Sequence, residues 1–172
     1  MKKSVNKKVK IKKKEDKSEV SLNFLKLSKS AETPEYAFET DVGFDVKAIE
    51  NVSLFPLEQK TVRTGIAIEI PEGHVGLVRD RAGIVQKMNI HTVAGTFDSG
   101  FRGEVSIMLV NMNEKTIEIE KGMRIAQIIL IPVIRAKLQE VKRLSDTERG
   151  KKSFGSTGMK KIVRELNKIS KK

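Results

Sequence analysis

The feature that most constrains the fold of this chain is a two-residue alternation of β-branched side chains. Ile66, Ile68 and Ile70 alternate with other residues ahead of a Pro-Glu-Gly turn. The same period recurs over residues 105–110 and 117–119. Successive side chains of a strand point to opposite faces, so this period predicts half-buried strands. Ile and Val together number 33 against 11 Leu, which also favours pleated sheets, and we expect an all-β fold.

The segment 105–110 differs from an ordinary half-buried strand because both of its faces are apolar. Ser106, Met108 and Val110 form a second face that is nearly as apolar as the first. Such a strand is covered on both sides, either by its own fold or by a partner subunit. Helical spacing is confined to residues 82–88 and to the basic segment 160–169.

The net charge of +12 lies at the two ends of the 172-residue chain. Nine Lys face two acidic residues at one end, and six basic residues face one acidic residue at the other, whereas the body between them carries 19 of each sign. A body-wide basic surface for nucleic-acid phosphates is therefore not predicted. The predicted organisation is a disordered Lys-rich extension (1–18), a β domain (19–144), a polar arm (145–158) and a basic tail (159–172). We interpret the tails as solubilising extensions, with nucleic-acid contact as the alternative.

Two classes of protein are disfavoured by composition. There is no Cys, so a disulfide framework and thiol catalysis are excluded and a reducing cytoplasm is compatible with the chain. The longest apolar stretch, 125–134, is too short to span a bilayer and contains Gln127 and Pro132. We expect a cytoplasmic protein with no membrane contact.

Five Gly-containing segments are candidates for chemistry. In VGFDVKA (42–48), Asp45 is an acid in an apolar run, which either needs a partner such as Arg, a metal or water, or lies on an edge strand facing water. In RDRAGIVQK (79–87), two Arg precede a possible helix start, which suits phosphate, although a surface ion pair of Asp80 with either Arg is the alternative.

The third segment, AGTFDSGFRGEV (94–105), is the most informative. Its glycines imply tight backbone geometry or close approach to a ligand around Asp98. Such a hairpin can present main-chain groups to a base, an aromatic ring to a sugar and a carboxylate to a water. An ordinary hairpin whose Asp forms an Asx-turn is the alternative.

The last two segments are KGMRIAQIIL (121–130) and RGKKSFGSTG (149–158). In the former, Arg124 and Gln127 are polar groups in an apolar strand and must be satisfied. The latter combines Gly, hydroxyls and one Phe, which suits an anion-binding loop or else a flexible tail. The isolated His74 and His91 do not suggest a metal site.

The order and spacing of these five segments resemble the five motifs of the trimeric dUTP pyrophosphatases (dUTPases), over about residues 22–158. The matching stretches are VGFD (42–45), RAG (81–83), GTFDSGFRGE (95–104), GMRIAQ (122–127) and RGKKSFGSTG (149–158). The resemblance implies a distorted β-barrel or jelly-roll and a homotrimer whose active sites are shared between subunits. It also implies Mg²⁺-dependent hydrolysis of dUTP to dUMP and pyrophosphate.

The resemblance implies a role for each matching residue. Asp98 would activate the water that attacks the α-phosphorus, and Asp45 would support, through water, an Mg²⁺ held mainly by the triphosphate. The implied contacts within the first four segments are Arg81, Ala82, Gly83 and Gln127 with phosphates, the main chain of Gly95, Thr96, Phe97 and Asp98 with uracil, and Phe101 with deoxyribose. From a third subunit, Phe154 would close over the uracil, Arg149, Ser156 and Thr157 would contact phosphates, and Gly155 would also bind substrate.

The chemistry is consistent with the residues themselves. Phosphoryl transfer needs charge neutralisation, positioning and an in-line water, which an Asp, a few Arg, backbone N–H groups and Mg²⁺ supply without a covalent nucleophile. Four positions depart from the family pattern: Ala82 replaces a usual Ser, Asp80 a common Pro, Phe101 the usual Tyr and Met123 a turn Asp. Two alternatives remain: a dUTPase-like protein that binds nucleotide or nucleic acid with little turnover, and a dCTP deaminase-like enzyme.

Overall fold

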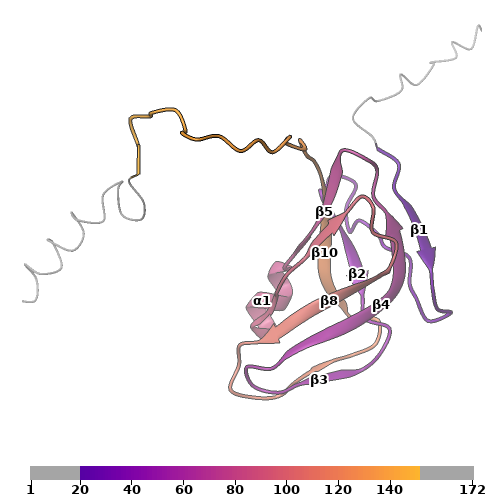
Figure 1. Cartoon of the computed structure of the whole chain (residues 1–172). Helices are drawn as coiled ribbons and strands as arrows, with labels where there is room; N and C mark the ends of the chain where they lie inside the picture. Colours follow the sequence, from indigo (N-terminus) through magenta and orange to yellow (C-terminus); the bar gives the residue numbers. More distant parts are fainter. Residues whose placement is uncertain (1–19, 152–172) are drawn as a thin grey trace, which may run out of the picture. The chain divides into compact units, whose positions relative to one another are not determined.

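The computed structural model describes residues 20–151, and in this range the regular structure is almost entirely β (Figure 1). The elements, in chain order, are β1 (Asn23–Lys26), β2 (Gly43–Lys47), β3 (Val52–Leu54), β4 (Gln59–Glu69), β5 (His74–Arg79), α1 (Ala82–Met88), β6 (Ile90–Thr92), β7 (Thr96–Asp98), β8 (Glu104–Asn111), β9 (Ile117–Ile119) and β10 (Arg124–Pro132). The expected all-β class is thus confirmed, and the helix predicted over 82–88 is present with those bounds.

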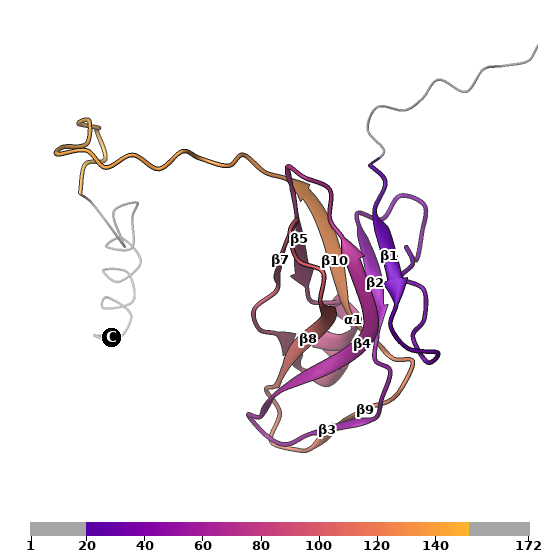
Figure 2. The same ribbon diagram turned by 45° about the vertical axis from the view of Figure 1, so that its right-hand side comes forward.

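The strands form two four-stranded antiparallel sheets and one two-stranded ribbon (Figure 2). One sheet has the order β1-β4-β8-β6 and the other β2-β10-β5-β7, while β3 pairs with β9. We call them the β8 sheet and the β10 sheet. Within residues 20–151 no ladder joins the two sheets into a closed barrel.

The two sheets contribute their inner faces to one hydrophobic core. From the β8 sheet, Val105, Ile107 and Leu109 are fully buried, and from the β10 sheet Val46 and Ile128 are equally buried. The alternation seen in the sequence is therefore the alternation between core and outer face.

Within residues 20–151, the outer face of β8 is only partly covered. Ser106 and Val110 are half-buried, and Met108 is 39% exposed. Within residues 20–151 the chain's own fold therefore covers this second face only in part.

The chain divides into two compact units after Arg135. In the second unit, residues 136–151 are exposed and contain no helix or strand, and Arg143 pairs with Asp146 at 2.8 Å. The helical segment expected at 160–169 lies outside the described residues. Among the residues that the structure describes, no helix is long and apolar enough to cross a membrane.

Candidate active site

Asp45 lies at the centre of a charged cluster on the β10 sheet. It belongs to the edge strand β2, but its side chain is buried, with a residue exposure of only 5%. Arg81 Nε donates a hydrogen bond of 2.7 Å to Asp45 Oδ1, and Arg124 Nε lies 3.3 Å from Oδ2. The alternative of an edge-strand Asp facing water is therefore wrong, because two guanidinium groups compensate the buried charge.

The second oxygen of Asp45 is only partly satisfied. Within the described residues no donor forms a well-aligned hydrogen bond to Oδ2, although Arg124 is close enough for an ion pair. Arg124 is shared, because its Nη2 donates to Glu35 Oε1 at 2.8 Å. This hydrogen bond, and next the one from Lys47, hold the pKa of Glu35 below its usual value. The cluster thus joins the first, second and fourth sequence segments.

Asp80 is bound to β6 and not to either neighbouring Arg. The backbone N–H and the hydroxyl of Thr92 both donate to Asp80 Oδ1 at 2.6 Å, and His91 Nδ1 lies 2.9 Å from Oδ2. Burial alone would raise the pKa of Asp80, but the hydrogen bonds from Thr92 and His91 outweigh it and lower that pKa. The alternative of a surface ion pair between Asp80 and an adjacent Arg is therefore wrong.

Gln127 of β10 connects Asp80 to the Asp45 cluster. Its Nε2 donates a hydrogen bond of 2.9 Å to the main-chain oxygen of Asp80. Its Oε1 faces Gly43, where an added Cβ would lie only 2.4 Å away. The glycine of the first segment therefore leaves room for the glutamine of the fourth.

The helix α1 starts beside this cluster. Arg81 is its N-cap residue in an extended conformation, and no side chain caps the first turn by a hydrogen bond. No atom would contact a Cβ at Gly83 within 4 Å, so the space next to the first turn is open. Ala82 has no hydroxyl to offer at this point.

The third segment forms β7 and a tight turn that leads to β8. The N–H of Phe101 donates a hydrogen bond of 3.0 Å to the main-chain oxygen of Asp98, which closes the turn. The side chain of Asp98 is exposed, and within residues 20–151 it neither accepts a hydrogen bond nor forms an ion pair. The Asx-turn alternative is therefore wrong, and a free carboxylate is available.

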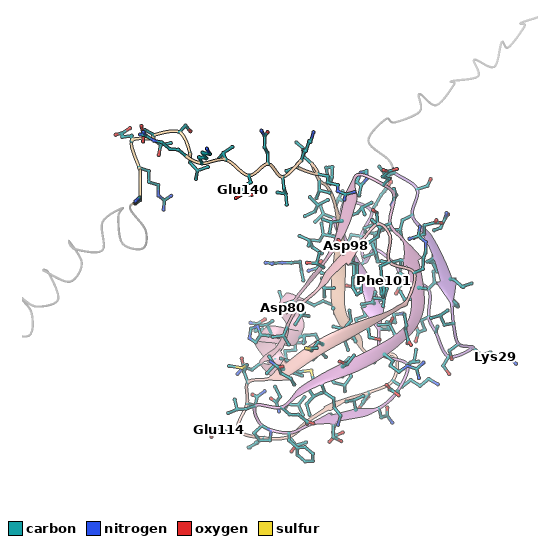
Figure 3. The ribbon with its side chains drawn as sticks, viewed as in Figure 1. Lys29, Asp80, Asp98, Phe101, Glu114 and Glu140 are labelled. Atoms are coloured by element: carbon teal, nitrogen blue, oxygen red, sulfur yellow. The ribbon has the colours of Figure 1, made fainter. Side chains whose placement is uncertain are left out.

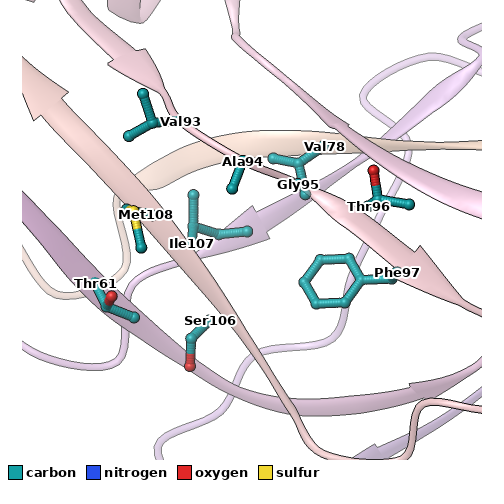
Figure 4. Close-up of a pocket in the computed structure, with 10 residues that line it drawn as sticks. All are labelled: Thr61, Val78, Val93, Ala94, Gly95, Thr96, Phe97, Ser106, Ile107 and Met108. Carbon is teal, nitrogen blue, oxygen red and sulfur yellow. The ribbon is translucent and has the colours of Figure 1, made fainter.

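The hairpin that carries Asp98 is split open. β7 pairs with β5 and β8 pairs with β4 and β6, so in the described residues no ladder joins β7 to β8 although they are consecutive. Val93, in the connection between β6 and β7, still donates its N–H to the main-chain oxygen of Met108 in β8. The split encloses a cavity of about 210 Å³, lined by Thr61, Val78, Val93, Ala94, Gly95, Thr96, Phe97, Ser106, Ile107 and Met108 (Figure 4).

Two aromatic rings lie on this hairpin. The ring of Phe97 lines the cavity, and its centroid is 5.5 Å from that of Phe101 with a tilt of 38°. Phe101 is 38% exposed and covers Gly103, where an added Cβ would lie 2.7 Å from the ring. The glycine therefore leaves room for the Phe101 ring.

Within one chain the hairpin and the Asp45 cluster lie at different levels along β5; Figure 3 labels Asp98 and Phe101 of the hairpin, and Asp80, which directly follows β5. On β5, Val75 is opposite Asp98, whereas Arg79 is opposite Gln127. Four residues of extended strand span about 13 Å, and the two sets lie on opposite sides of β5. One chain therefore brings the first, second and fourth segments together but not the third.

The fifth segment is described only at its start. Arg149 lies in the exposed part of the chain, whereas Phe154, Gly155, Ser156 and Thr157 lie outside the described residues. Sequence reasoning missed Thr92, His91 and Glu35 as partners of the site. Glu35 had no signal in the sequence, because its loop meets β2 through tertiary contacts such as the bridge Glu35↔Asp45 and the ion pair of Glu35 with Lys47.

A metal ion would have few protein ligands here. In the part of the chain that the structure describes, no group of three or more His, Cys, Asp or Glu side chains could hold one. Mg²⁺ usually keeps several waters and binds one or two carboxylates plus substrate phosphates. The unsatisfied Oδ2 of Asp45 fits a single contact of this kind, and a protein cage does not fit.

Comparisons with known proteins agree with this arrangement of motifs. The dUTPase family model matches residues 29–158. The deoxyuridine 5'-triphosphate nucleotidohydrolase of Clostridium tetani is 39% identical over 143 residues, 82% of this chain and 99% of that protein. The one of Gloeothece citriformis is 42% identical over 142 residues, 81% of this chain and 98% of that protein.

Solved structures give the same result. The dUTPase of Staphylococcus bacteriophage 80alpha with dUPNHPP has a TM-score of 0.77 and 33% identity, covering 80% of this chain and 98% of that one. A mutant dUTPase from phage phi11 of S. aureus, described with a structural Mg(II) ion, has a TM-score of 0.69 and 27% identity over 74% of this chain and all of that one. The sequence motifs, the fold and the relatives together show that the chain belongs to the dUTPase family.

Proposed function

We propose that this protein hydrolyses dUTP to dUMP and pyrophosphate and that the split hairpin is its uracil site. The observation that carries the proposal is the cavity between β7 and β8. Main-chain N–H and C=O groups that a closed hairpin would pair are left free there to hydrogen-bond the edge of a flat ring. The cavity is below the about 300–1,000 Å³ of pockets for drug-sized ligands, so it suits one base and not a whole nucleotide.

Selectivity for deoxyuridine nucleotides follows from the residues around the same cavity. A base edge held by fixed main-chain groups leaves a competing base with unpaired groups, which discriminates more strongly than shape alone. A deoxyribose packed on Phe101 leaves little room for a 2′-hydroxyl. Both effects favour deoxyuridine nucleotides.

Asp98 is the proposed general base. Its free carboxylate accepts a proton from a water as the water oxygen bonds to the α-phosphorus and the bond to the β-phosphate oxygen breaks. Pyrophosphate leaves with the negative charge that develops, and no covalent intermediate with the protein forms. Asp98 is exposed at the end of β7, directly after Phe97 of the cavity wall, as this role requires.

The phosphates are assigned to the Asp45 cluster. Arg81 supplies positive charge, Gln127 and the 82–83 backbone supply N–H donors, and the buried Asp45 fixes the guanidinium of Arg81. Mg²⁺ bound to the triphosphate would neutralise phosphate charge, with Asp45 Oδ2 in contact through water. From the arm, Arg149, Phe154, Gly155, Ser156 and Thr157 would complete the site.

The distance between hairpin and cluster means that one chain does not make a complete site. A general base must be within hydrogen-bond reach of its water, and about 13 Å along β5 is several times too long. We therefore infer that the hairpin of one subunit meets the cluster of a neighbour in a homotrimer. The partly exposed outer face of β8 supports such an assembly.

The test is Asp98→Asn, because an amide has the shape of the acid but cannot take the proton. Pyrophosphate release from dUTP with Mg²⁺ should fall by about 10²-fold or more while a non-hydrolysable dUTP analogue binds as before. Glu72→Gln, a carboxyl-to-amide change at an exposed turn residue, is the control. Turnover near that of the wild type would remove Asp98 from the mechanism.

One observation favours a second candidate, nucleotide binding with little turnover. The first turn of α1 has Ala82 in place of a hydroxyl residue and no side-chain cap, so one phosphate contact is missing. Tight binding of the analogue by wild-type protein with no release of pyrophosphate would support this candidate. Release of ammonia from dCTP would instead indicate deaminase-like chemistry.

A further inference from the structure

Asp80 ties the end of one sheet to the other sheet. It follows β5 of the β10 sheet, and its carboxylate accepts hydrogen bonds from His91 and Thr92 of β6 in the β8 sheet. β6 is itself fixed, because His91 is opposite Val110 and Thr92 is opposite Leu109 in the ladder with β8. The tie therefore fixes the loop after β5 to a rigid strand.

The residues held by this tie are those next to the proposed phosphate site. Arg81 follows Asp80 directly and points to Asp45, and the main-chain oxygen of Asp80 accepts the hydrogen bond of Gln127. Only residues 80 and 81 separate β5 from α1. A shift of Asp80 therefore moves both the side chain of Arg81 and the main-chain oxygen that Gln127 binds. The helix start has no side-chain cap of its own to hold it.

We infer that Asp80 is a positioning residue, which sets Arg81 and Gln127 for the phosphates of the substrate without touching it. The inference rests on the proposed function, because it takes the Asp45 cluster as the phosphate site. None of the hydrogen bonds that Asp80 forms within residues 20–151 goes to a residue that lines the base cavity, and the β6–β8 ladder holds β6 without Asp80. Losing the tie should therefore weaken phosphate binding and leave base binding intact.

Two ligands separate these effects, namely a non-hydrolysable dUTP analogue with Mg²⁺ and deoxyuridine, which has no phosphate. In Asp80→Ala the Kd of the analogue should rise about tenfold, and the Kd of deoxyuridine should change by less than about twofold. Asp80→Asn should rescue analogue binding, because its amide oxygen still accepts from Thr92 and its amide nitrogen can donate to a neutral His91.

Two further variants keep the test valid if Asp80→Ala is unstable. Thr92→Val removes one of the three donors at constant size, so it should weaken analogue binding in the same direction but less. Adding Asp80→Ala to Thr92→Val should raise the Kd of the analogue by a smaller factor than Asp80→Ala does in the wild type, as expected of two residues that interact. Glu114→Ala, an exposed acid with the same charge change, is the matched control and should leave both ligands unaffected.

The outcomes are distinguishable. The positioning role would be overturned if Asp80→Ala bound the analogue as well as the wild type does, or if it lost affinity for deoxyuridine and for the analogue equally. The proposed function would still stand in that case, provided that the wild-type protein hydrolyses dUTP. If the wild-type protein bound neither the analogue nor deoxyuridine, both the positioning role and the proposed function would be overturned.

Discussion

Gly95 occupies a position in the hairpin that no other residue fits. Its φ of +139° is rarely adopted by residues with a side chain, and an added Cβ would lie 2.6 Å from Cβ and 3.1 Å from Cγ2 of Val78. The backbone cannot move away, because the N–H of Val78 donates a 2.8 Å hydrogen bond to the Gly95 oxygen. Val78 is itself buried, so it has no space to retreat.

The cost of Gly95→Ala can be worked from these two facts. A strained backbone conformation costs about 1–3 kcal/mol, and an extra methyl in a packed site costs about 1–3 kcal/mol. We therefore expect the free energy of unfolding to fall by about 2–6 kcal/mol, against a total of about 5–15 kcal/mol for typical proteins. The variant should also lose uracil nucleotide binding, because Gly95 lines the cavity.

The assay is guanidinium unfolding at fixed protein concentration, with Gly73→Ala as the control. Gly73 also has a positive φ, of +77°, but nothing lies within 4 Å of an added Cβ. That control should lose only about 1 kcal/mol, since its strain is partly offset by a less flexible unfolded chain. The difference between the two variants measures the contact with Val78 together with the rarer φ of Gly95. Equal loss in both, within about 0.5 kcal/mol, would refute the packing argument.

Two further predictions concern the arm and the acid limit. Truncation after Gly150 removes Phe154, Ser156 and Thr157, so pyrophosphate release should collapse. The mass measured by sedimentation should remain that of the trimer. A fully active monomer would contradict the role of the arm and the trimer alike. The pKa of Asp80 is lowered from 3.8 in the folded protein. The stability that the ionised carboxylate gives the folded state is therefore complete above pH 3.8 and is lost as the pH falls through the pKa of the folded state. In urea unfolding, the stability gap between wild type and Asp80→Asn should shrink from about pH 6 to about pH 3.

Local patterns in the sequence predicted four elements of the fold. The alternation at 66–70, 105–110 and 117–119 corresponds to β4, β8 and β9, and the helical spacing at 82–88 to α1. These features depend on period and on turn residues, which act between neighbours in the chain. The motifs and their order were likewise sufficient for the family.

Pairing between distant residues could not be predicted in this way. An ion pair of Asp80 with Arg79 or Arg81 was one interpretation, but Thr92 and His91 occupy both of its oxygens. The sequence left open whether Asp45 faces water or has a partner, and the structure buries it between two Arg. In each case the partner lies on another segment of the fold, and strand order and register decide which side chains meet.

The sequence by itself determined that this is an all-β member of a nucleotide-hydrolysing family, because strand period and motif spacing are written along the chain. Only the tertiary structure decided that β7 and β8 separate into different sheets. That separation leaves a cavity beside the two strands, and Asp98 lies about 13 Å along β5 from the level of the Asp45 cluster. Both results depend on which strands pair, and hydrogen bonds between segments far apart in the sequence decide that pairing.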